Sequence, residues 1–124
     1  MKGYEIINKI IDIAKKEKDM DLLDLMDMVM NDFSAYVDLC SSQENRLAIA
    51  KQRMYKEDYL NFVKTLDQQR RNIHNNCINN VNIINRLCEV NNLPIFYNGD
   101  IDDRYAVGDF VGEIVNDAFK NRKR

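Results

Sequence analysis

The sequence has one proline, four glycines and no tryptophan among its 124 residues, so few positions force a helix to end. The alternation of apolar and polar residues that marks half-buried strands is nearly absent. Apolar residues instead recur at three- and four-residue steps along most of the chain, as they do in amphipathic helices. The sequence therefore predicts an all-α protein.

Long apolar runs are also missing. The first residues, MKGYEIINKIIDIAKKEK, carry a charge every few positions, which is typical neither of a signal peptide nor of a membrane span. Apolar residues make up 45% of the chain and charged residues 31%, which are ordinary values for a globular protein with one core. We expect a single domain over residues 1–124, located in the cytoplasm and without a membrane partner.

Metal and redox chemistry have little support in the composition. The chain has one histidine and three cysteines, and Cys40, Cys77 and Cys88 each fall at an apolar helical position without a CxxC motif. We therefore expect three reduced core thiols, no metal and no cofactor. The acidic segment NGDIDD lacks the glycine and glutamate of an EF-hand loop, so Asp102 or Asp103 is expected to cap a helix instead.

The chain also lacks a strong charge of one sign. A formal net charge of −2 argues against a protein that binds nucleic acid through bulk electrostatics. The charge is nevertheless uneven, because residues 1–42 carry 5 basic and 9 acidic groups whereas residues 43–92 carry 8 and 5. We expect these two segments to pack against each other.

The spacing of apolar residues predicts four helices, at residues 4–16, about 20–54, from about 57 to the sequence NNLP, and after the NGDIDD segment. An antiparallel bundle with two long central helices and two shorter ones is the natural arrangement. One alternative divides the second helix, because Ser41 and Glu44 in SSQE fit a capping box. In the last helix, Gly108 and Gly112 lie four residues apart, which would admit a close helix neighbour.

A polar cluster interrupts the third helix at DQQRRNIHNNCINNV, which holds the only histidine. By helical phase, Arg70 and His74 lie on the apolar face with Asp67 at its edge, whereas Arg71 points outward. If the second and third helices form a hairpin that turns near residue 56, Glu44 lies opposite Arg70. We expect a buried ion pair there, because an unpaired buried charge is costly. The alternative is a small polar pocket that binds an anionic group between Arg70 and His74.

The segments RRNIHNNCI, INRLCEV, LPIFYNGDIDDR and VGDFV resemble a family of small bacterial proteins known only as a domain of unknown function. The resemblance covers roughly residues 58–122 and implies a bacterial helical protein without a particular activity. The chain also resembles the helical ribonucleases of toxin–antitoxin systems in placing Arg and His on one helix. Those enzymes space the two residues more widely than this sequence does.

Two functional hypotheses follow. The first is a non-enzymatic helical interaction protein, which self-associates or binds a protein partner through surplus apolar residues on the second helix. The second is an anion-binding module or ribonuclease-like enzyme centred on Arg70, His74 and Glu44, with Asp67 beside them. The sequence favours the first hypothesis, because it shows neither a nucleophile nor a set of metal ligands to complete an active site.

Overall fold

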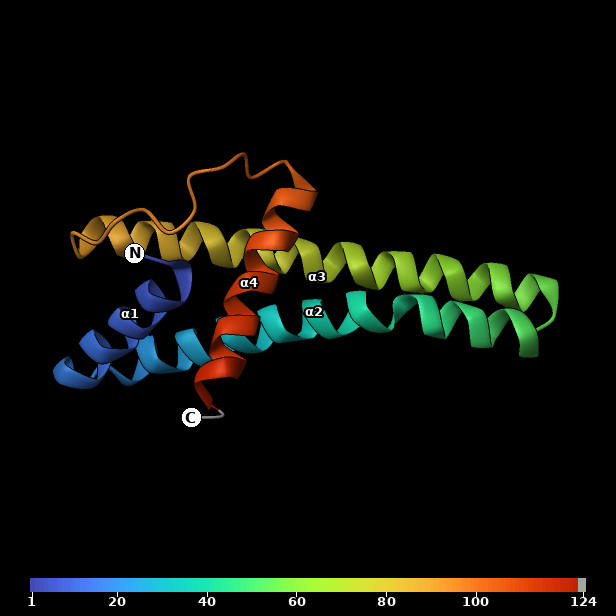
Figure 1. The fold of residues 1–124 in the computed structure, drawn as a ribbon, viewed down its shortest axis with the longest axis horizontal. Helices are drawn as coiled ribbons and strands as arrows, with labels where there is room; N and C mark the ends of the chain where they lie inside the picture. The colour runs from blue at the N-terminus through green and yellow to red at the C-terminus, as the bar shows by residue number, and fades with distance from the viewer. Residues whose placement is uncertain (123–124) are drawn as a thin grey trace.

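The computed structural model describes residues 1–122, which form four helices (Figure 1). These are α1 at Gly3–Glu17, α2 at Met20–Arg53, α3 at Lys56–Val90 and α4 at Arg104–Arg122. No strand occurs in this range, so the prediction of an all-α bundle with two long central helices is confirmed. None of these helices is both long and apolar enough to cross a membrane.

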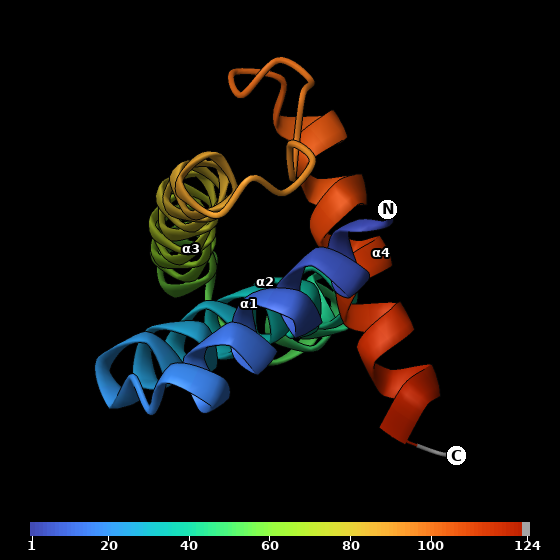
Figure 2. The ribbon, with the colours of Figure 1, turned by 90° about the vertical axis from the view of Figure 1, so that its left-hand side faces the viewer.

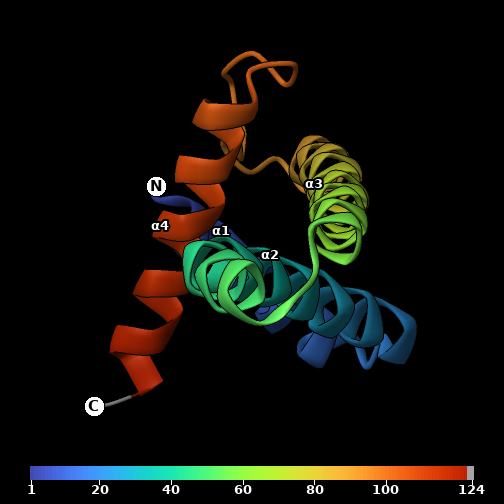
Figure 3. The same cartoon turned by 90° about the vertical axis from the view of Figure 1, so that its right-hand side faces the viewer.

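The two long helices form an antiparallel hairpin, and the two shorter helices cover one part of it. α1 folds back along the first part of α2, and α4 crosses the hairpin at a steep angle (Figures 1 and 2). Viewed along the hairpin, α2 lies between α3 and α4 (Figure 3). Toward the connection at residues 54–55, the hairpin extends beyond α4, and only α2 and α3 contact each other there (Figure 1).

α2 is one continuous helix of 34 residues, as the spacing of its apolar residues predicts. Asp19 caps its start by accepting a hydrogen bond from the backbone N–H of Leu22 at 3.0 Å. The hydroxyl of Ser41 donates to the carbonyl oxygen of Asp38 at 3.1 Å, within the same helix. The alternative in which Ser41 starts a new helix is therefore wrong.

The core lies where α1 and α4 meet the hairpin. All four helices contribute completely buried apolar side chains, among them Ile6, Ile10, Met26, Phe33, Val81, Ile84, Val107 and Ile114. Burial of such side chains contributes about 1.5–3 kcal/mol each and is the main force that holds the helices together. The described part of the chain therefore has its apolar core at the end of the hairpin remote from residues 54–55.

The loop between α3 and α4 is fastened to α3 by a pair of hydrogen bonds. Asn85 accepts from the backbone N–H of Tyr97 at 3.0 Å and donates to its carbonyl oxygen at 3.2 Å. Asp103 then caps α4 by accepting from the backbone N–H of Ala106 at 3.1 Å, as expected. These contacts fix the start of α4 and with it the position of Arg104.

Asn80 is a buried polar residue that sequence analysis did not single out. It is 3% exposed, and its Nδ2 donates to Oδ2 of Asp32 on α2 at 2.8 Å. The contact joins the two long helices inside the bundle, so it adds a specific polar link to the apolar packing.

Replacing Asn80 by alanine is expected to lower the free energy of unfolding by about 1–3 kcal/mol, because the Asp32 carboxylate loses its hydrogen-bond donor. The neighbouring substitution Asn79→Ala is the matched control, since Asn79 is exposed and should change stability by less than about 0.5 kcal/mol. Urea denaturation of both variants measures the difference. Equal effects would show that the Asn80–Asp32 contact contributes nothing.

Candidate functional site

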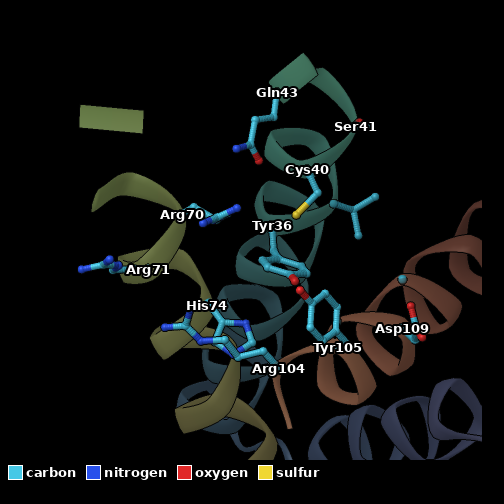
Figure 4. A pocket seen from close by; sticks show the side chains of 13 residues that line it. Tyr36, Cys40, Ser41, Gln43, Arg70, Arg71, His74, Arg104, Tyr105 and Asp109 are labelled. Atoms are coloured by element: carbon cyan, nitrogen blue, oxygen red, sulfur yellow. The ribbon is translucent and has the colours of Figure 1, made fainter. Parts of the chain in front are cut away.

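A pocket of about 590 Å³ lies where α4 crosses the hairpin, and α2, α3 and α4 all line it (Figure 4). Its imidazole and cationic groups are His74, Arg70, Arg71 and Arg104. The first three come from the polar cluster of α3, and Arg104 comes from the first residue of α4. The fold thus brings Arg104, which is distant in the sequence, to the polar cluster of α3.

His74 is buried at the edge of this pocket. Its side chain is 4% exposed, and Nε2 has no hydrogen-bond partner among the described residues. The nearest aromatic neighbour is Tyr36 on α2, with ring centroids 5.7 Å apart. A buried polar atom without a partner costs about 1–3 kcal/mol, so this nitrogen is a local defect in the packing.

Burial lowers the pKa of His74 below its ordinary value, and the positive charges of Arg104 and Arg70 lower it further. The imidazole is therefore neutral at pH 7. The same shift indicates that both guanidinium groups lie close enough to act on His74. A negatively charged ligand would raise the pKa of His74, because it would stabilise the protonated ring.

The arginines differ in their surroundings. Arg70 pairs with Asp67, one turn earlier on α3, with Nη2 and Oδ1 3.3 Å apart and both side chains about two-fifths exposed. Figure 4 shows Arg70 directed toward Tyr36, and Arg71 directed away from the other groups. Neither Arg71 nor Arg104 forms an ion pair within residues 1–122. Two guanidinium groups therefore flank His74, while Arg71 lies at the rim.

The expected buried ion pair between Glu44 and Arg70 is wrong. Glu44 is exposed and does not line the pocket. Arg70 pairs with Asp67 instead. Toward residues 54–55, α3 is the only helix that covers α2 (Figure 1). The buried residues in this part of α2 are therefore few, namely Leu39 and Ala50. Glu44 therefore lies outside the buried face of α2.

The α2 side of the pocket carries Tyr36 and Cys40. Cys77 and Cys88 are buried as expected, but Cys40 is exposed, so its placement in the core is wrong. Burial, followed by the neighbouring Cys40, raises the pKa of Tyr36 to about 12, and the phenol stays protonated at neutral pH. Tyr36 can therefore donate a hydrogen bond into the pocket, but it carries no negative charge that would repel an anion.

Glycines form part of the α4 wall. A Cβ atom at Gly108 would lie 2.6 Å from the hydroxyl oxygen of Tyr36, so glycine at this position is needed for the observed placement of the phenol. A Cβ atom at Gly112 would meet nothing within 4 Å. The four-residue spacing of the two glycines predicted a close helix neighbour, which the structure shows at Gly108 and not at Gly112. The roles of Tyr36 and Arg104 were missed, because they depend on how α4 crosses α2 and α3.

The chain belongs to a family of proteins of unknown function (DUF3232), whose model matches residues 2–124. The match extends beyond the residues 58–122 that carry the resemblance in the sequence, and it includes all four helices. No curated protein and no solved structure matches the chain.

Because His74 is the only histidine, its ring resonances can be followed by proton NMR without assignment. We expect a pKa below the ordinary value of about 6.5 in the folded protein. As the pH falls below about 6.5, the unfolded chain binds a proton before the folded one does, so stability decreases. The decrease approaches about 1.4 kcal/mol per pH unit until the folded pKa is reached.

The variant His74→Gln lacks the titrating imidazole but keeps all the carboxylates. Its difference from the wild type therefore measures the contribution of His74 alone. Denaturation at several pH values between about 7.5 and 5.5 should give a smaller loss of stability on acidification for His74→Gln than for the wild type. Identical slopes, or a folded pKa at or above about 6.5, would contradict the burial described for His74.

Proposed function

We propose that the protein is a binding module for a small anionic ligand, which it holds in the pocket between α2, α3 and α4. The observation that carries this proposal is the set of guanidinium groups that lines the pocket together with His74, a buried imidazole whose Nε2 lacks a protein partner. Folding a polar nitrogen into this position costs stability. An anion bound beside the ring would offset that cost by stabilising the protonated imidazole.

The chemistry of the flanking groups suits phosphate or carboxylate. Guanidinium groups such as those of Arg70 and Arg104 can each donate two parallel hydrogen bonds to such an anion. The protonated Tyr36 hydroxyl adds a neutral donor from the opposite side of the pocket. A phosphate group, which is close to dianionic at neutral pH, would engage the two guanidinium groups most strongly.

Binding is favoured over catalysis in this proposal. Glu44, the carboxylate of the ribonuclease-like alternative, lies outside the pocket. The buried thiol of Cys77 is a weak nucleophile at neutral pH, since burial and then the nearby Asp32 raise its pKa to about 12. No cluster of residues suited to a metal ion occurs within residues 1–122.

Arg104→Ala and Arg70→Ala are each expected to weaken the binding of inorganic phosphate by roughly 10- to 100-fold, the effect of losing a hydrogen bond to a charged group. Arg71→Ala is the matched control, because it removes the same charge from the adjacent position of α3 while its guanidinium points away from His74 (Figure 4). We expect it to weaken binding only a few-fold. Isothermal titration calorimetry at fixed ionic strength measures all three.

The test requires that the weaker phosphate binding of these variants does not result from unfolding. Arg70 is half-exposed and its pair with Asp67 is worth at most about 1 kcal/mol, so its alanine variant should remain folded. If all three variants weaken binding equally, phosphate is attracted by the overall positive charge of this surface and is not held at a specific site. Wild-type protein that does not bind phosphate, carboxylates or phosphate esters would contradict the proposal.

A second proposed function is self-association through the end of the hairpin. The supporting observation is a group of exposed apolar side chains near residues 54–55, where neither α1 nor α4 covers α2 and α3 (Figure 1). Ile49, Met54 and Leu60 are 41–49% exposed and Tyr55 is 86% exposed. Exposed apolar groups gathered in this way favour contact with another protein surface. A second copy of the chain would supply the same surface.

Leu60→Lys is expected to convert a dimer into a monomer, because it would bury a charge in the proposed contact. Val90→Lys is the matched control, since Val90 is another exposed apolar residue of α3, 78% exposed, at the opposite end of the helix. Sedimentation velocity at several concentrations measures the oligomeric state. A wild-type protein that stays monomeric at high concentration would exclude self-association.

We further propose that the protein acts in the bacterial cytoplasm. The support is its three free cysteines, which suit a reducing compartment, together with the bacterial character of the family that the sequence resembles.

A further inference from the structure

We infer that the anion held in this pocket is the phosphate of a nucleotide whose base carries an exocyclic amino group. The inference rests on the proposed anion-binding function and adds the chemistry of the rest of the ligand. It starts from the size of the pocket, about 590 Å³. This volume lies within the range of about 300–1,000 Å³ for sites that bind whole small molecules, and an isolated phosphate would fill little of it.

The wall opposite the arginines of α3 suits a flat ring. Gly112 on α4 carries no side chain, and a Cβ atom there would meet nothing within 4 Å, so the helix backbone is bare at this point of the wall. The ring of Tyr105, on the same helix, is 87% exposed at the pocket. An exposed aromatic ring is a surface on which a nucleobase can stack, and the bare backbone at Gly112 leaves room for the base beside it.

Asp109 provides the selectivity within this wall. Its exposed carboxylate lines the pocket and forms no ion pair with the residues that the structure describes. A carboxylate is unfavourable beside a simple anion, but it accepts hydrogen bonds from an amino group. Cytosine and adenine present an exocyclic amino donor, whereas the corresponding group of a uracil base is a carbonyl acceptor.

The charge of the protein favours a free nucleotide over a longer nucleic acid. The formal net charge is −2, and Glu113 lies in a second cavity that shares Val37, Asp109 and Gly112 with the pocket. A polynucleotide leaving the pocket along this side would pass acidic groups in place of the basic track that such ligands require.

Calorimetry with the full chain compares cytidine 5′-monophosphate, uridine 5′-monophosphate, ribose 5-phosphate and inorganic phosphate. We expect the cytidine nucleotide to bind 10- to 100-fold more tightly than the uridine nucleotide, which differs from it at the exocyclic group of the ring. Asp109→Asn should abolish most of this difference, because a side-chain amide can pair with either base. Gly112→Leu should reduce the affinity for the cytidine nucleotide to that for phosphate, since the new side chain occupies the wall.

Cys40 reports where the ligand binds. It is the exposed cysteine at the pocket, whereas Cys77 and Cys88 are buried, so a thiol reagent should modify it first. Cytidine 5′-monophosphate should slow this modification in the wild-type protein and much less in Gly112→Leu. Unchanged reactivity with bound nucleotide would place the ligand elsewhere and overturn the inference.

The outcomes separate the two levels of the proposal. If phosphate and both nucleotides bind with equal affinity, the inference fails while the anion-binding function stands. If none of the four ligands binds, both fail. If a 5′-phosphorylated trinucleotide that begins with cytidine binds more tightly than the free nucleotide, the assignment to a free nucleotide is overturned in favour of an RNA end.

Discussion

α4 crosses the α2–α3 hairpin over part of its length only, and this partial cover determines where the main features of the molecule lie. On one side of the crossing, α1, α4 and the α3–α4 loop close over the hairpin and form the apolar core. On the other side the two long helices contact only each other, and Ile49, Tyr55 and Leu60 remain exposed. The pocket lies at the crossing itself, between these two regions.

The crossing also explains the chemistry of the pocket. It buries His74 beside Tyr36 and brings Arg104 from the start of α4 to the polar cluster of α3. Gly108 permits the close approach of α4 to the Tyr36 hydroxyl. The cost of an unpartnered imidazole nitrogen, about 1–3 kcal/mol, is a sizeable part of the net stability of a small domain. Such a local cost is understandable where a ligand is bound, and it has no evident structural benefit.

The sequence predicted the helices well and the site in part. Apolar spacing and sparse helix-breaking residues predicted the four helices and the unbroken α2, and the acidic segment predicted the cap at Asp103. Helical phase correctly placed His74 on a buried face. It failed for Glu44 and Cys40, because phase shows which residues share a face but not how far a neighbouring helix covers it. The contribution of Arg104 depends on the path of the loop from Val90 to α4, which leaves no periodic signal.

The most direct test of the central claim is the pKa of His74, measured by proton NMR with and without saturating phosphate at equal ionic strength. If the anion binds beside the imidazole, it stabilises the protonated ring, and linkage requires the pKa to rise on binding. We predict a rise of about one unit or more with phosphate and a smaller rise in Arg104→Ala. A pKa that is the same in phosphate and in sodium chloride would contradict the claim that this pocket binds anions.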